Sequence, residues 1–170
     1  YDNDEADSGT NFWQELASVD TTGDNHTTGT FTAKKYLMVD VNVVTTGGAV
    51  SQRLTFNDDT GSNYAQRRSG DGASDSPGAS KSSIDGLNDD LVTNSVGFTR
   101  YFIINKSAQE KLVIAEAISG EVAGAGNAPT RDECVFKWAN TSAQITKIDL
   151  DNNKAGDWAS GSFIKVYGAD

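Results

Sequence analysis

The residues of this sequence that could do chemistry are mainly carboxylates, with 24 Asp and Glu against 14 Lys and Arg. One run, DLDNN from position 149, places oxygen ligands at alternate positions, as the start of a calcium loop does. Lys154, however, stands where an EF-hand needs glycine, and Ser160 stands where the bidentate glutamate belongs. Asp149, Asp151 and Asn153 therefore match only part of a metal motif. We expect a turn there and no cofactor, with a structural Ca²⁺ as the alternative.

Nucleophilic catalysis has little support in the sequence. His26 is the sole histidine and lies in a run rich in Gly, Thr and Asn, TTGDNHTTG, which predicts a solvated loop. Cys134 is the sole cysteine and alternates with Phe136 and Trp138, which predicts a small buried hydrophobe and excludes an intrachain disulfide. The sequence contains no Gly-x-Ser-x-Gly elbow and no phosphate-binding glycine loop. We therefore predict a protein that is not an enzyme and has no catalytic residues.

One further carboxylate interrupts an apolar pattern. Glu116 stands between Ile114 and Ile118 on the same face of a predicted strand. A catalytic carboxylate of a glycosidase needs a partner across a cleft, and 24 acidic residues offer no specific pair. We expect Glu116 to lie at the edge of the core and to pair with Arg53 or Arg100.

Aromatic residues and glycosylation sequons indicate surface contacts. Aromatic rings beside polar loops can stack on sugars or on a neighbouring subunit, or else close one end of the core. The residues that we expect at such a rim are Phe12, Trp13, Tyr64 and Trp158. Three acceptor sequons fall at predicted turns, where glycans could be attached, at Asn25, Asn105 and Asn140.

The net charge excludes two classes of partner. A charge of −10 repels phosphate backbones and anionic membranes, and the only basic cluster is the short pair Arg67–Arg68. No apolar stretch approaches the ~20 residues that span a bilayer. We therefore expect neither nucleic acid nor a membrane as a partner.

Alternating apolar and polar residues predict strands throughout the chain. In Lys35–Thr45 the side chains of Leu37, Val39, Val41 and Val43 share one face, and Gly47–Gly48 would join this run in a hairpin to Val50–Phe56. Turn residues separate the runs, as in sandwiches and barrels. We predict one antiparallel, jelly-roll-like β-sandwich domain over residues 12–170 with about nine or ten strands. The remaining predicted strands are Phe12–Val19, Thr28–Ala33, Val96–Asn105, Glu110–Ser119, Val135–Trp138, Ala143–Leu150 and Ser162–Tyr167.

Four segments carry separate expectations. Ser69–Ser83 is rich in Gly, Ser and Asp, which predicts a long surface loop, and Ser83–Val92 could form a short helix. The acidic residues 1–11 could act as an assembly arm. Phe12–Val19 either folds back as the first strand of its own domain or docks on another copy.

The runs RLTFNDDTGSNYAQRR at Arg53–Arg68 and WANTSAQITKID near the C-terminus, followed by ASGSFIKVYG, carry a resemblance. They resemble uncharacterised structural proteins of phages and environmental microbes, which are virion-associated or extracellular appendage subunits with jelly-roll domains. The resemblance covers most of the chain from about Phe12 onward, and its motifs are architectural. It implies a subunit found outside cells or in a virion, and it implies no catalytic residues.

We therefore expect a structural subunit whose partners are copies of itself, associating through strand edges and loop rims into a filament or virion layer. The alternative is a carbohydrate-binding sandwich that uses rim tryptophans on glycans.

Overall fold

A computed structural model describes residues 12–170, which form twelve β-strands in two packed sheets. All strand pairs within the sheets are antiparallel, so the predicted all-β sandwich is confirmed. The proposed assembly arm, residues 1–11, lies outside the described residues. No helix in residues 12–170 has the length and hydropathy to cross a membrane.

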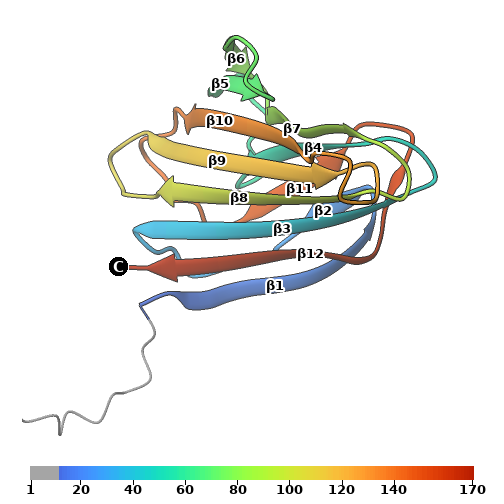
Figure 1. Cartoon of the computed structure of the whole chain (residues 1–170). Helices are drawn as coiled ribbons and strands as arrows, with labels where there is room; N and C mark the ends of the chain where they lie inside the picture. Colours follow the sequence, from blue (N-terminus) through green and yellow to red (C-terminus); the bar gives the residue numbers. More distant parts are fainter. Residues whose placement is uncertain (1–11) are drawn as a thin grey trace, which may run out of the picture.

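Eight strands form the larger sheet, in the order β1-β12-β3-β8-β9-β10-β5-β6 (Figure 1). β1 pairs with the C-terminal strand, so Phe12–Val19 does contribute the first strand of its own domain. The strands are β1 (Gln14–Gly23), β12 (Asp157–Ala169), β3 (Tyr36–Thr46), β8 (Val96–Ile104), β9 (Lys111–Gly120), β10 (Thr130–Trp138), β5 (Tyr64–Gly70) and β6 (Ser76–Lys81).

Four strands form the smaller sheet, in the order β2-β11-β4-β7. The chain crosses from one sheet to the other at most of its connections, and only β5–β6, β8–β9 and β9–β10 are consecutive neighbours in one sheet. The predicted hairpin across Gly47–Gly48 is therefore wrong, because β3 and β4 lie in different sheets. The four strands are β2 (Asn25–Thr27), β11 (Ile148–Asn152), β4 (Val50–Phe56) and β7 (Ile84–Leu91).

The core lies between the two sheets and follows the predicted alternation. Leu37, Val39, Val41 and Val43 of β3 are fully buried, as expected. An aromatic cluster fills the middle, where Phe56 lies 5.8 Å from Trp138 and 6.2 Å from Phe136 between ring centroids. Such close packing of large apolar side chains is the main contribution to the stability of the fold.

β9 turns its larger apolar side chains away from this core. Its inward residues include Ala115 and Ala117, which are buried, whereas its outward residues include Leu112, Ile114 and Ile118. The small side chain of Ala115 leaves room for the ring of Tyr101, its register partner on β8. As a result, large aliphatic side chains cover the outer face of the sheet.

Several local predictions are wrong. Ser83–Val92 contains strand β7 in place of a helix, and Ser69–Ser83 contains the whole of the edge strand β6. Thr28–Ala33 has no regular secondary structure, and in Ala143–Leu150 only the end joins β11. In β7 the short polar residues Asn88 and Asp90 adopt positive φ angles of 48° and 62°, which distort the strand. β6 and β7 are polar, and the alternation of apolar and polar residues that predicts a strand is too weak in them to be recognised.

Candidate functional site

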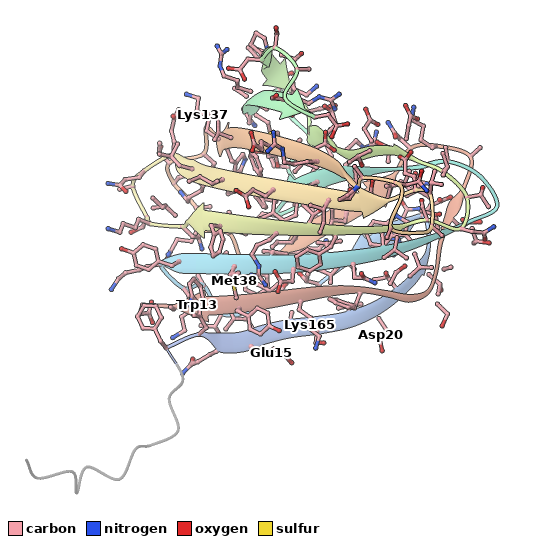
Figure 2. The ribbon with its side chains drawn as sticks, viewed as in Figure 1. Trp13, Glu15, Asp20, Met38, Lys137 and Lys165 are labelled. Atoms are coloured by element: carbon pink, nitrogen blue, oxygen red, sulfur yellow. The ribbon has the colours of Figure 1, made fainter. Side chains whose placement is uncertain are left out.

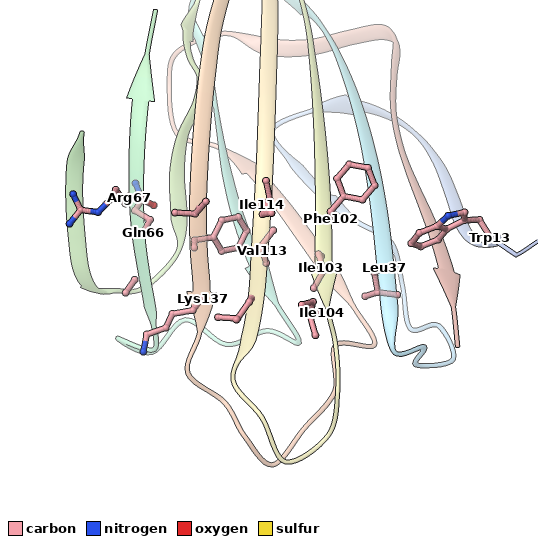
Figure 3. Close-up of a pocket in the computed structure, with 14 residues that line it drawn as sticks. Trp13, Leu37, Gln66, Arg67, Phe102, Ile103, Ile104, Val113, Ile114 and Lys137 are labelled. Carbon is pink, nitrogen blue, oxygen red and sulfur yellow. The ribbon is translucent and has the colours of Figure 1, made fainter. Parts of the chain in front are cut away.

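The outer face of the eight-stranded sheet is the candidate site, because large apolar side chains are exposed on three adjacent strands. On β9, Leu112, Ile114 and Ile118 are 51%, 59% and 53% exposed. Phe102 and Ile104 on β8 and Val135 on β10 are exposed beside them. Around these residues, Ile118 excepted, the surface is hollowed into a groove of about 580 Å³ (Figure 3). Contiguous exposed apolar patches of this kind mark interaction surfaces.

The strand register arranges the outer face in four rows, each named here by its β9 residue. The Leu112 row contains Tyr36, Ile104, Leu112 and Lys137, and the Ile114 row contains Tyr167, Met38, Phe102, Ile114 and Val135. The Glu116 row contains Lys165, Asp40, Arg100, Glu116 and Glu133. The Ile118 row contains Phe163, Asn42, Phe98, Ile118 and Arg131.

The Glu116 row is a charged line between apolar rows. Arg100 binds Asp40 with two hydrogen bonds, from Nε to Oδ1 at 2.6 Å and from one terminal nitrogen to Oδ2 at 2.7 Å. The hydrogen bond and the negative charge of Asp40 raise the pKa of Arg100. Glu116 lies opposite Arg100 in register, but the expected ion pair is wrong because Arg100 binds Asp40 and Arg53 binds Asp151.

Glu116 and Lys165 are the two charges of this row that stay unpaired. In residues 12–170 neither side chain forms an ion pair. Lys165 lies over the ring of Phe163, with 5.7 Å between Nζ and the ring centroid. Lys165 projects from the outer side of β12 near Glu15 and Asp20 of β1 (Figure 2). Both charges are therefore available to groups outside this chain.

Only part of the expected aromatic rim reaches the surface. Trp158 and Tyr64 are each 1% exposed, so the prediction that they lie at a rim is wrong. Tyr64 instead donates its hydroxyl hydrogen to the carbonyl oxygen of Asp59 and accepts a hydrogen bond from the N–H of Phe56. Phe12 is exposed, and Trp13 lines the groove at the end away from Arg67 (Figure 3).

The three candidate metal ligands do not assemble into a site. Asp149 and Asp151 belong to strand β11, so the predicted turn is wrong, and Asn153 follows the strand. Asp149 binds Lys147 at 3.2 Å, and Asp151 binds Arg53 at 3.1 Å. No group of three or more His, Cys, Asp or Glu in residues 12–170 is placed to hold a metal ion.

The three sequons lie in different environments. Asn25 is exposed, and Asn140 is partly exposed, with its side-chain oxygen accepting hydrogen bonds from Ser142 and Ala143. Asn105 is 0% exposed, and its amide group donates to the carbonyl oxygens of Lys34 and Ile145. In the folded protein a glycan on Asn105 is therefore excluded.

The two isolated reactive side chains are both buried. Burial raises the pKa of the Cys134 thiol to about 12, which confirms the predicted small hydrophobe and makes the thiol unreactive. The predicted solvated loop at His26 is wrong, because this residue is 6% exposed and stacks on Trp158 with 4.2 Å between ring centroids. Burial lowers the pKa of His26 below its ordinary value of 6.5, and Nε2 has no hydrogen-bond partner within residues 12–170.

The burial of His26 leads to a pH dependence of stability. Because the folded state disfavours the imidazolium, the unfolded state binds the proton more readily, and stability falls as the pH decreases below 6.5. The free energy of unfolding should decrease with a slope of up to about 1.4 kcal/mol per pH unit. Urea titrations between pH 8 and pH 5 measure this slope. In His26→Phe, which keeps the stacking on Trp158, we expect the slope to be much smaller, and an equal slope would contradict the assignment.

Comparisons with protein-family models, curated proteins and solved structures gave no match.

Proposed function

We propose that this protein is a non-enzymatic structural subunit that associates with copies of itself through the outer face of its eight-stranded sheet. The observation that carries the proposal is β9, which exposes Leu112, Ile114 and Ile118 while it buries two alanines. A strand with one side facing water normally buries its larger apolar residues, because each one left exposed costs about 1.5–3 kcal/mol. Covering this face with another protein surface removes that cost.

The order of the strands supports a jelly-roll class for the subunit, as we propose from the sequence. The strands β1-β12-β3-β8 and β2-β11-β4-β7 form two facing groups of four, and among these eight strands the chain alternates between the groups except from β4 to β7. The pairs β5–β6 and β9–β10 then extend the first sheet to eight strands. Jelly rolls of eight strands are common in viral capsids, which agrees with a virion layer or an extracellular filament as the assembly.

A growing assembly needs a second contact, and the exposed edge of β1 can supply it. The other three described edges are poor partners, because β2 has three residues, β6 carries Pro77, and β7 contains the positive-φ residues Asn88 and Asp90. β1 has ten residues and keeps a continuous register with β12 from Ala17 to Thr21. A strand from another copy can therefore pair with β1 and extend the sheet.

The carbohydrate-binding alternative has weaker support, because two of the four expected rim residues, Tyr64 and Trp158, are buried. The groove is mostly apolar, whereas sugars need convergent polar groups.

Sedimentation velocity of the full chain tests the proposal. We expect the sedimentation coefficient to rise with protein concentration in the micromolar range, since the outer face is covered when copies associate. A single monomeric species at all concentrations and salt conditions would overturn the proposal.

A further inference from the structure

We propose that two copies pack outer face to outer face about a two-fold axis that runs along the strands, midway between β3 and β8. This inference rests on the proposed function and specifies the partner surface, which is the same face of a second copy. The axis places β3 opposite β8, β12 opposite β9, and β1 opposite β10 of the other copy. Two-fold contacts of this kind are self-complementary, so each contact occurs twice.

The apolar rows match each other across this axis. In the Ile114 row, Met38 faces Phe102 of the second copy and Tyr167 faces Ile114. In the Leu112 row, Tyr36 faces Ile104 of the second copy. In the Ile118 row, Phe163 faces Ile118 of the second copy, and Phe98 faces Asn42. The exposed side chains of Phe102, Ile114 and Ile118 are thereby covered, whereas Val135 of β10 faces Glu15 on β1 of the second copy.

The charged residues also match. Within the Glu116 row, Lys165 faces Glu116 of the second copy, so the two unpaired charges of each copy become partners. Asp40 faces Arg100 of the second copy, and within each copy Asp40 already forms an ion pair with Arg100. At the margin, Asp20 faces Arg131 of the second copy. No pair of like charges meets along these rows.

Other two-fold axes give poorer contacts. An axis on β8 places Asp40 against Glu116, and an axis between β8 and β9 places Asp40 against Glu133. An axis on β3 places Lys165 against Arg100. An axis across the strands along the Glu116 row sets each charge of that row against the same residue of the second copy, and an axis between β12 and β3 leaves β9 uncovered. The axis between β3 and β8 is the one that avoids these conflicts and covers β9.

The size of the face fits a stable dimer. Six strands about 4.8 Å apart and four rows about 6.8 Å apart cover about 800 Å². A standard stable protein interface buries about 800 Å² on each partner. Two sheets can pack face to face with their strand directions within about 30° of each other, as in sandwiches.

The pair Lys165 and Glu116 provides a specific test. Three strand spacings of about 4.8 Å, or about 14 Å, separate the two side chains within one copy. This distance exceeds the Debye length of about 10 Å at 0.1 M salt, so the two charges interact weakly within the chain. If a charge reversal at one of these positions restores the dimer affinity that a reversal at the other has lowered, the two charges must therefore interact between copies.

The experiment uses two single variants, Lys165→Glu and Glu116→Lys, studied alone and as an equimolar mixture. Alone, each variant sets like charges against each other twice per dimer, and we expect its dimer dissociation constant to rise at least about tenfold. In the mixture both contacts join opposite charges, so a heterodimer should form with nearly wild-type affinity. Differently tagged copies and native mass spectrometry measure the heterodimer fraction, and thermal unfolding confirms that each variant is folded.

The outcomes separate the inference from the proposed function. Weak association of each variant alone and recovery in the mixture support the two-fold axis between β3 and β8. If the wild type associates but the mixture stays as weak as the single variants, or the single variants associate normally, this axis is wrong while self-association stands. If the wild type itself stays monomeric, the proposed function fails and the inference fails with it.

Discussion

Ile114→Asp is expected to weaken self-association at least about 30-fold, which corresponds to about 2 kcal/mol for a well-covered interface residue. Ile114 lies on β9 in one of the two inner rows of the outer face, and it is 59% exposed in the single copy. A carboxylate there keeps its hydration in the monomer but must lose it when a second sheet covers the face. Sedimentation equilibrium of the variant and the wild type measures the difference.

Val122→Asp is the matched control for this change. Val122 is also an exposed aliphatic residue, but it lies in the connection between β9 and β10, away from the four rows. We expect its association to match the wild type. For the folded monomer, both variants should lie within about 1 kcal/mol of the wild type in urea unfolding, since both positions face solvent. Equal loss of association in the two variants would exclude the outer face as the contact surface.

Asn105→Asp is expected to destabilise the folded chain by about 3–5 kcal/mol, a large part of the stability of a typical domain. The side-chain amide of Asn105 donates to the carbonyl oxygens of Lys34 and Ile145, and its oxygen accepts the N–H of Ile145 at 2.6 Å. An aspartate at this position would direct a carboxylate at two carbonyl oxygens inside the protein. Urea unfolding followed by tryptophan fluorescence measures the loss.

Asn25→Asp makes the same chemical change at an exposed position of β2 and serves as the control. We expect a change within about 0.5 kcal/mol for this variant, as for most surface substitutions. The large effect should therefore be confined to Asn105. Similar stabilities for the two variants would show that the hydrogen bonds of Asn105 contribute little to the fold.

The pattern in β3 shows what the sequence could predict. Val and Leu alternate with polar residues there, and a period of two fixes which side chains face the core once the run is a strand. The same alternation marks β8, β9 and the C-terminal strand, and it predicts the burial of Cys134. β6 and β7 lack an apolar period, because their sequences are polar and contain glycine.

Residues of the candidate site were harder to recognise. In β9 both faces carry apolar residues, so the period alone cannot tell the inner face from the outer one. The sequence of β9 does contain one indication of its outer face: Ala115 and Ala117 on one side are much smaller than Ile114 and Ile118 on the other. Its meaning depends on Tyr101 and Phe136, which belong to neighbouring strands and occupy the space that the alanines leave.

An acidic, all-β chain with alternating strands follows from the residues alone, because charge and a period of two are local properties. Strand order and register set the rest: which face of β9 meets the core, the burial of His26, Tyr64, Asn105 and Trp158, and the common row of Lys165 and Glu116 across four strands. These properties depend on strand order and register between distant segments. They arise when bulky side chains from several strands compete for the same volume, which no single segment of the sequence specifies.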